Sequence, residues 1–359
     1  MRIPIYEPYL NGNESKYIQE AVESTWVSSR GKFVDQFEAM CADYVGRKFA
    51  SSCSNGTVAL DLALKAVEIQ PGDEIIVASF TYVASVNCIL YNQAKPVFMD
   101  VVDGHWNVTL EEIQKQCTDD TKAIILSNTY GSLPDIASIE TFCKSKGIKL
   151  IEDAAESLGS SQNGKMSGSF GDVSTFSFFG NKTITSGEGG MVLTDDEEIY
   201  DRISQLKNQG NSKTVRYYHD VLGYNYRMTN LQAAIGVAQF EQLDNILAKK
   251  QQIVDWYHEL VDERVAFQSH LDGVVSSNWM VAADFGDEAT KNKVVEAMDN
   301  NEIETRPFFI PINRMPYINI EADLPVTDRI ANTGLCLPSF PGLTREQLEK
   351  IADTINKAL

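Results

Sequence analysis

Short apolar runs alternate with helix-sized stretches through roughly the first 240 residues, and this alternation limits most strongly how the chain can fold. Each run has the length of one strand and is rich in branched residues. Parallel neighbours need a crossover between them, and the intervening stretches are long enough to supply it. The pattern therefore predicts an α/β fold with a mainly parallel sheet covered on both faces. The runs are EIIVA (74–78), PVFMD (96–100), AIILS (123–127), KLIED (149–153), VSTFSFF (173–179) and GMVLTD (190–195).

A second region follows the alternating one. A helical pattern without internal proline runs from Leu231 to about Val261 and leads the chain out of the sheet region. At 359 residues the chain is long enough to build two cores. We expect a large domain over 1–240 and a small C-terminal domain over 241–359. The tail holds a strand-like stretch (278–285), a helical stretch (289–300), an extended stretch (303–311) and a closing helix (345–359).

Charge and composition exclude several classes of partner. A formal charge of −19 would repel nucleic acid and anionic membranes. The sequence has no apolar run of about 18 residues, which a bilayer span needs, and its start, MRIPIYEPYL, does not resemble a signal peptide. The six cysteines are scattered without the spacing of metal ligands. These features predict a cytoplasmic protein without nucleic-acid, membrane or metal partners.

Two segments place polar groups where ligands often bind. In SNGTVAL (54–60), Asn55, Gly56 and Thr57 precede a helical pattern, so free N–H groups and the helix dipole could bind an anion. Ordinary helix capping explains the same residues. In LIEDAAES (150–157), an apolar strand ends in Glu152 and Asp153, at the edge of the sheet where ligands bind in open α/β folds. Capping of the next helix is again the alternative.

A third segment, SFFGNKTITSGEGG (177–190), contains a single lysine, Lys182. It matches neither the phosphate-binding P-loop pattern nor the glycine pattern of dinucleotide-binding folds. A lysine in a loop is most often a surface residue. Phe178 and Phe179 beside Lys182 favour a different interpretation, because partial burial lowers the pKa of the amine and frees it to attack a carbonyl group.

A fourth segment, GYNYRMTNLQAAIG (223–236), leads directly into the long helical pattern. Core packing and a helix cap at Thr229 or Asn230 explain much of it. They do not explain why Asn225 and Arg227 precede the cap. The alternative is that these two side chains contribute to a site, across a subunit interface.

Together, an anion-binding helix start, a strand-end carboxylate and a lysine match the phosphate, pyridine nitrogen and aldehyde of pyridoxal 5′-phosphate. In these motifs the chain resembles the nucleotide-sugar aminotransferases of the aspartate-aminotransferase fold (fold type I). The resemblance runs nearly end to end and implies a large domain with a mixed, mostly parallel seven-stranded sheet, followed by a small C-terminal α+β domain. Its other motifs are IPIYEPYL, STWVSSRGKFV, TYVASVN, ETRPFF and LPSFPGL.

The resemblance also implies roles for individual residues. Lys182 and Asp153 would be catalytic, Lys182 by bonding the cofactor's aldehyde and carrying protons, and Asp153 by pairing with the pyridine nitrogen. Asn225 would reach the cofactor phosphate of a neighbouring subunit, which implies a homodimer with composite active sites. The remaining cofactor-binding positions would be Gly56, Thr57 and Ser177 at the phosphate, Tyr82 on the ring face and Glu156 near the ring 3′-oxygen.

The activity that the resemblance implies is transfer of an amino group from L-glutamate to C4 of a nucleotide-linked 4-keto-6-deoxy sugar, with GDP-4-keto-6-deoxymannose as the first candidate. A UDP- or dTDP-linked sugar is the alternative, and a non-catalytic nucleotide-sugar-binding protein is a third. Related enzymes that dehydrate the sugar carry His at the position of Lys182, so the lysine favours transamination. At Asn313 and Leu133 the sequence differs from the residues that are usual in the family it resembles. Candidate substrate-binding residues are Trp26, Ser28, Arg30, Tyr130, Arg227, Arg306 and Asn313.

Overall fold

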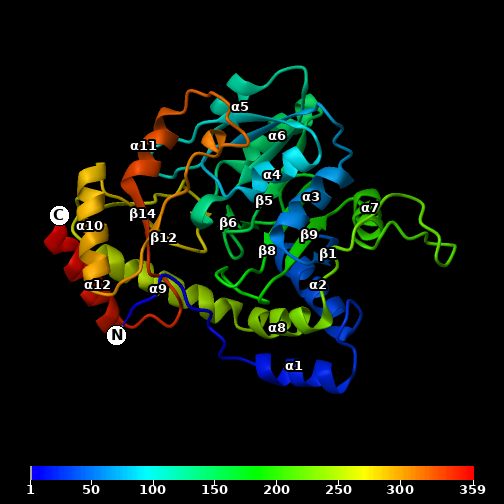
Figure 1. The fold of residues 1–359 in the computed structure, drawn as a ribbon, viewed down its shortest axis with the longest axis horizontal. Helices are drawn as coiled ribbons and strands as arrows, with labels where there is room; N and C mark the ends of the chain where they lie inside the picture. Colours follow the sequence, from blue (N-terminus) through cyan, green and yellow to red (C-terminus); the bar gives the residue numbers. More distant parts are fainter. Residues whose placement is uncertain (1) are drawn as a thin grey trace.

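A computed structural model describes residues 2–359, and a seven-stranded sheet forms its centre (Figure 1). The strands pair in parallel from β3 to β8, and the remaining strands, β9 and β1, pair antiparallel. The expected mixed, mostly parallel sheet is therefore confirmed. In spatial order the strands are β1 (Phe49–Cys53), β9 (Gly190–Thr194), β8 (Val173–Ser177), β5 (Lys149–Asp153), β4 (Thr121–Ser127), β2 (Glu74–Ala78) and β3 (Lys95–Met99).

Both faces of this sheet are covered, because successive side chains of a strand point to opposite faces. On β2, Ile75 and Val77 belong to the core beneath α3, α4 and α7, whereas Ile76 belongs to the core beneath α5 and α6. Each of the three is fully buried. The helices are α3 (Gly56–Ala66), α4 (Ala84–Tyr91), α5 (Leu110–Gln116), α6 (Ile136–Lys146) and α7 (Glu197–Lys207).

A third core lies where β1, β8 and β9 meet three helices, α1 (Glu14–Glu23), α2 (Lys32–Val45) and α8 (Asn230–Phe240). The prediction of one helix from Leu231 to Val261 is wrong, because the chain turns at Glu241 and Gln242 before α9 (Leu243–Leu260). The turn changes the direction of the chain: α8 packs on α1 and α2, whereas α9 starts in the same core with Leu243 and Ile246 and then packs on α12 (Arg345–Ala358).

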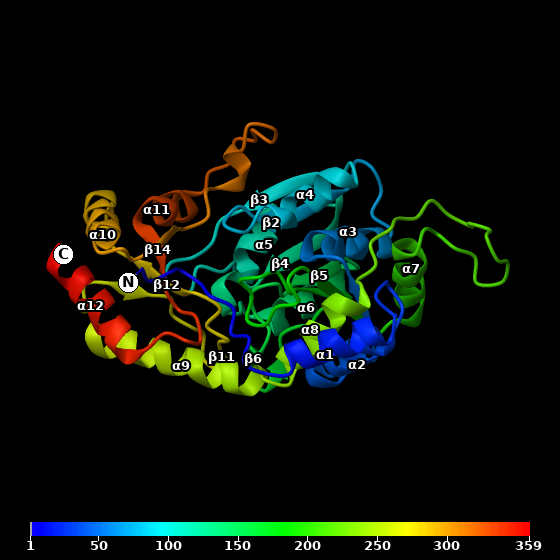
Figure 2. The same ribbon diagram turned by 60° about the horizontal axis from the view of Figure 1, so that its bottom comes forward.

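The C-terminal part forms its own four-stranded antiparallel sheet, which lies beside the large sheet (Figure 2). Its core joins this sheet to α9, α10 (Glu288–Asn300) and α12. A short helix, α11 (Pro325–Thr333), precedes its last strand. A three-stranded sheet of β11 (Val274–Val275), β6 (Ser161–Gln162) and β7 (Lys165–Met166) connects the two regions. The four strands are β10 (Ala266–Phe267), β12 (Val281–Asp284), β14 (Gly334–Leu337) and β13 (Arg306–Pro307).

Within residues 2–359, no helix combines the length and the apolar character that a membrane crossing requires.

Candidate active site

Lys182 lies in the irregular segment between β8 and β9, and its side chain is directed inward: only 12% of it is exposed. The backbone of this segment is well fixed. The Lys182 N–H donates to the Phe179 carbonyl oxygen at 3.0 Å, and the Tyr6 hydroxyl donates to the Lys182 carbonyl oxygen at 2.5 Å. The interpretation of Lys182 as a surface residue is therefore excluded.

Two carboxylates from the end of β5 face this amine. Asp153 is the last residue of β5, and Glu156 lies in the turn after it. Glu156 Oε1 is 3.7 Å from Lys182 Nζ, and the other carboxylate oxygen accepts the Tyr130 N–H at 2.9 Å. Asp153 Oδ2 accepts a hydrogen bond from the Ser85 hydroxyl at 2.6 Å. The strand order explains this cluster, because β5 and β8 are parallel neighbours whose carboxyl ends share one edge of the sheet.

Burial shifts the pKa of each of these groups toward its neutral form. It raises the pKa of Glu156 to about 7 and also raises that of Asp153, although the Ser85 hydrogen bond acts in the opposite direction on Asp153. It lowers the pKa of the Lys182 amine, against the attraction of Glu156 and Asp153. A lysine whose pKa is lowered loses its proton more readily and can act as a nucleophile and as a base.

The N-terminus of α3 packs against Ser177, the last residue of β8, and this close packing explains the glycine at the helix start. A Cβ at Gly56 would lie 2.7 Å from the Ser177 Cβ, a contact that real structures do not tolerate. Asn55 caps the helix through the Val58 N–H at 3.0 Å. The N–H groups of Gly56 and Thr57 have no acceptor within the helix, so they are available to an anion.

Some buried polar groups around Lys182 have no hydrogen-bond partner within the described part of the protein, and pyridoxal 5′-phosphate could supply one. The Thr175 hydroxyl, on β8 opposite Asp153, is buried without a hydrogen-bond partner, and so is the Asn181 side-chain oxygen. Buried polar groups in native proteins normally have partners. The Tyr82 side chain at the rim is 58% exposed, so its ring is free to cover a planar ligand. A polar, planar and anionic ligand would satisfy these groups.

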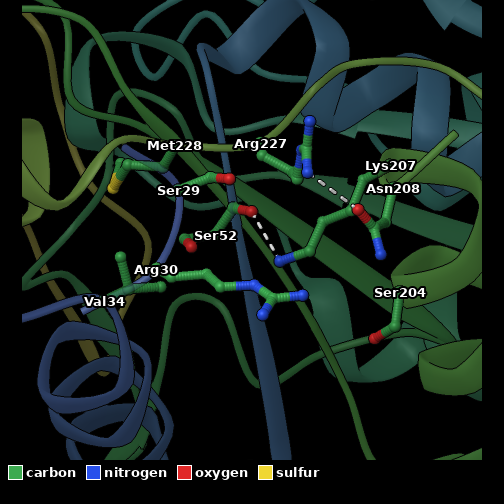
Figure 3. A pocket seen from close by; sticks show the side chains of 9 residues that line it. All are labelled: Ser29, Arg30, Val34, Ser52, Ser204, Lys207, Asn208, Arg227 and Met228. Atoms are coloured by element: carbon green, nitrogen blue, oxygen red, sulfur yellow. Dashed lines mark hydrogen bonds between the residues drawn. The ribbon is translucent and has the colours of Figure 1, made fainter. Parts of the chain in front are cut away.

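A second cluster gathers several predicted residues around a cavity of about 170 Å³ (Figure 3). Arg30 and Arg227 line it together with Lys207. Figure 3 shows the Arg30 side chain extending into the cavity toward Ser204. Arg227 donates to the side-chain oxygens of Asn208 at 3.0 Å and of Asn225 at 3.0 and 3.1 Å. Among the interactions of residues 2–359, none joins Asn225 or Arg227 to Lys182 of the same chain.

The N-terminal candidates Trp26 and Ser28 contact α8 through their backbones. Their carbonyl oxygens accept hydrogen bonds from the side chain and backbone of Asn230, at 2.7 and 2.6 Å. The Trp26 side chain is 54% exposed and lines a different cavity from that of Arg30. The structure thus brings Arg30 and Arg227 together, and places Trp26 beside them on the neighbouring surface.

The other three candidate substrate-binding residues, Tyr130, Arg306 and Asn313, differ in the contacts that their side chains make. Tyr130 is buried in the aromatic cluster with Phe309, and its φ of 56° is held by the hydrogen bond to Glu156. Arg306, on β13, is close enough to Lys182 to lower the pKa of its amine. The Asn313 side chain is occupied by internal bonds, since it accepts from the Ser79 hydroxyl at 2.8 Å and donates to the Ile320 carbonyl at 3.1 Å.

Three residues of this site were not predicted from the sequence. Ser85 holds Asp153, Tyr6 holds the Lys182 backbone, and Trp279 places its ring centroid 4.0 Å from Lys182 Nζ. Ser85 belongs to the motif TYVASVN and could have been found there. Tyr6 and Trp279 reach the lysine from distant parts of the chain, and no local pattern predicts such contacts.

Comparison with known proteins identifies the family. The model of the DegT/DnrJ/EryC1/StrS aminotransferase family matches residues 8–356. GDP-perosamine synthase of Vibrio cholerae is 45% identical to the chain, with 98% of each protein aligned. GDP-perosamine synthase of Escherichia coli O157:H7 is 43% identical over 99% of the chain and 98% of the relative. The aminotransferase TlmJ from Streptoalloteichus hindustanus has a similar structure, with a TM-score of 0.93 and 25% identity over 99% of this chain and 98% of that one. The chain therefore belongs to the DegT/DnrJ/EryC1/StrS aminotransferase family.

Proposed function

We propose that this protein is a pyridoxal 5′-phosphate-dependent aminotransferase that transfers the amino group of L-glutamate to C4 of GDP-4-keto-6-deoxymannose and so produces GDP-perosamine. The observation that carries the chemistry is the buried Lys182 amine, 3.7 Å from the Glu156 carboxylate and beside Asp153. Two relatives named GDP-perosamine synthase, 45% and 43% identical over nearly the whole chain, support the choice of sugar nucleotide.

The cofactor would be held by the residues that surround this amine. When bound, pyridoxal 5′-phosphate supplies an aldehyde that reacts with amines and a pyridine ring that withdraws electrons from the reacting carbon. Asp153 would keep the ring nitrogen protonated, and Tyr82 would cover the ring face. The phosphate would be bound by the N–H groups of Gly56 and Thr57 and by the Ser177 hydroxyl, with Asn225 reaching it from a second subunit.

The chain's own groups would hold and move the proton. With its pKa lowered by burial, the Lys182 amine can take a proton from the substrate carbon and return it. Glu156 lies within reach of the amine and also fixes the Tyr130 backbone, so it orders the wall of the site. Asp153, held by Ser85, remains in place while the proton moves. Arg30, Arg227 and Arg306 would bind the carboxylate of glutamate and the diphosphate of the sugar nucleotide.

We infer that the functional unit is a homodimer with composite sites. The segment between α7 and α8 projects from the body of the molecule, as Figures 1 and 2 both show. Tyr217 and Leu222, on this segment, are each 84% exposed, and large apolar side chains in such a cluster are typical of interaction surfaces. Asn225 and Arg227 lie in the last part of this segment, just before α8. A second subunit that covers this segment would bring both residues to the Lys182 site of that subunit.

We also propose a cytoplasmic location, where glutamate and sugar nucleotides are made. The product would serve a surface polysaccharide such as the O-antigen of lipopolysaccharide. We place the boundary between the large domain (1–240) and the small domain (241–359) at the turn after α8, because α9 carries the chain from the core that contains α8 to the core of the small sheet.

The cofactor assignment is tested by chemical capture. Protein incubated with pyridoxal 5′-phosphate should turn yellow, and borohydride should then attach a pyridoxyl group to Lys182, located by peptide mass spectrometry. L-Glutamate should remove the yellow colour and release 2-oxoglutarate. Capture at another lysine, or an unchanged adduct in Lys182→Ala, would contradict the assignment.

A further inference from the structure

The backbone that carries Lys182 is held by two side chains from outside the large sheet. The Trp279 indole Nε1–H donates to the Asn181 carbonyl oxygen at 2.7 Å, and the Tyr6 hydroxyl donates to the Lys182 carbonyl oxygen at 2.5 Å. Trp279 itself is 3% exposed and lies just before β12. Two consecutive carbonyl groups are thereby fixed from the C-terminal region and from the N-terminal segment.

The Trp279 ring also faces the amine directly. Its centroid lies 4.0 Å from Lys182 Nζ, and the ring packs against Tyr130 with a centroid separation of 6.2 Å and an interplanar angle of 21°. The face of an indole attracts a cation, most strongly where water is excluded. Three charged groups also act on this amine. Glu156 and Asp153 attract its protonated form, and Arg306 repels it.

A buried lysine on α9 anchors Trp279 in turn. Lys250 is 1% exposed, and its Nζ donates to the carbonyl oxygens of Trp279 at 3.0 Å and of Ser339 at 2.9 Å. Burial lowers the pKa of this amine to about 7. A neutral amine has two N–H donors, which is the number of carbonyl groups it contacts. Lys250 thus joins α9 to the backbone at one end of the small sheet, where the chain enters β12 and leaves β14 and where Trp279 meets Lys182.

We propose that Trp279 is a positioning residue that holds the Lys182 amine and favours its protonated form, and that Lys250 fixes Trp279 in this arrangement. The inference rests on the proposed role of Lys182 in amino transfer. The small sheet would then influence the protonation of the Lys182 amine, because Trp279, which contacts this amine, belongs to the segment that leads into β12.

The test measures the proton affinity of Lys182 directly. In the full chain loaded with pyridoxamine 5′-phosphate, in which Lys182 bears no cofactor, the rate of acetylation of Lys182 by acetic anhydride is followed against pH by peptide mass spectrometry. Trp279→Leu should lower the midpoint of this titration by about one pH unit, because the attraction of the ring is lost. Trp279→Phe keeps an aromatic face and should shift the midpoint by less.

Two further variants separate positioning from general packing. Lys250→Met keeps the length of the side chain but loses both donors, and it should lower the midpoint in the same direction as Trp279→Leu. Trp256→Leu is the matched control, since the Trp256 ring faces Arg345, at 5.6 Å, instead of Lys182. It should leave the midpoint unchanged.

An unchanged midpoint in Trp279→Leu would overturn the proposal and show that Trp279 only packs. If the leucine variant does not fold, unchanged midpoints in both Trp279→Phe and Lys250→Met would overturn it. The titration needs no turnover of any sugar, so a wrong choice of sugar nucleotide would leave this test intact.

Discussion

At the scale of single residues, burial and charge act against each other around Lys182. Burial lowers the pKa of the amine and raises the pKa of Glu156 to about 7 and that of Asp153 as well, so each of the three groups is shifted toward its neutral form. Perturbed groups of this kind gather where proton transfer is needed. The same burial costs stability, since each group must be removed from water.

Because burial destabilises the charged form of Glu156, the effect of Glu156→Gln on stability should depend on pH. The folded state raises the pKa of this carboxyl from 4.5 to about 7, so the stability that it contributes is complete below pH 4.5 and is lost as the pH rises through 7. Glutamine does not titrate. The free energy of unfolding of the cofactor-free variant, relative to the wild type, should therefore increase by on the order of 3 kcal/mol between pH 4.5 and pH 8 in urea titrations.

Glu140→Gln is the control with the opposite sign. Burial acts to raise the pKa of Glu140, but the Gly171 N–H together with Lys165 and Lys144 outweighs it, and the pKa is lowered. Its contribution is present above the ordinary pKa and lost as the pH falls. The stability of Glu140→Gln relative to the wild type should therefore decrease as the pH rises. A flat difference for Glu156→Gln would mean that Glu156 is not buried as described.

The sequence was sufficient to find the residues whose chemistry is local. Lys182, Asp153 and Gly56 stand in short motifs, and the strand that ends in Asp153 already predicted a carboxylate at the ligand-binding edge of the sheet. Tyr6 and Trp279 could not be predicted, because their contacts to 181 and 182 exist only once the N-terminal segment and the small sheet have packed against the large one.

At the scale of elements, the close packing of the α3 N-terminus against β8 positions the N–H groups that are proposed to bind the cofactor phosphate. Its first turn approaches β8 so closely that only glycine fits at Gly56. Gly190 has a similar constraint, since a Cβ there would lie 2.4 Å from the Asn55 carbonyl oxygen. Gly190, which follows Lys182, thus allows β9 to begin against the cap of α3 and keeps the helix start beside the end of β8.

Gly56→Ala should weaken cofactor binding. The added Cβ would meet Ser177 at 2.7 Å and push the helix start away from β8, which misplaces the N–H groups proposed to bind the phosphate. An overpacking strain of about 1–3 kcal/mol corresponds to a loss of pyridoxal 5′-phosphate affinity of about five- to 150-fold, measured by absorbance titration.

Gly342→Ala provides the matched control, because a Cβ at this position meets only Phe340 carbon atoms, at 3.6 and 3.7 Å. Its affinity for the cofactor should equal that of the wild type. Equal affinity for both variants would show that the close approach of α3 to β8 does not support the phosphate site.

Element boundaries were harder to predict than elements. The six strand-like runs all correspond to strands, because branched residues buried on both faces leave a clear pattern. β1 (Phe49–Cys53) was missed, since an edge strand rich in serine lacks that pattern. The break between α8 and α9 was missed because no proline or glycine marks it. The turn redirects the chain from the core that α8 and the start of α9 share toward the core of the small sheet.

At the scale of the whole molecule, the proposed dimer makes a prediction about mixed subunits. If Asn225 acts on the site of the neighbouring subunit, Lys182→Ala and Asn225→Ala should each be inactive alone. Mixing them by unfolding and refolding at equal concentration should restore about a quarter of the wild-type activity, because half of the dimers are mixed and each has one intact site. No recovery in mixed dimers that sedimentation confirms would contradict a composite site.

The most direct test of the account is the transfer reaction itself. Purified protein loaded with pyridoxal 5′-phosphate is given L-glutamate and one 4-keto-6-deoxy sugar nucleotide at a time, carrying GDP, UDP or dTDP, and the products are identified by mass spectrometry and nuclear magnetic resonance. The account predicts that GDP-4-keto-6-deoxymannose is converted to GDP-perosamine with the highest kcat/KM, and that Lys182→Ala forms none. Absence of an amino sugar from the GDP substrate, with wild-type protein that carries the cofactor on Lys182, would contradict it.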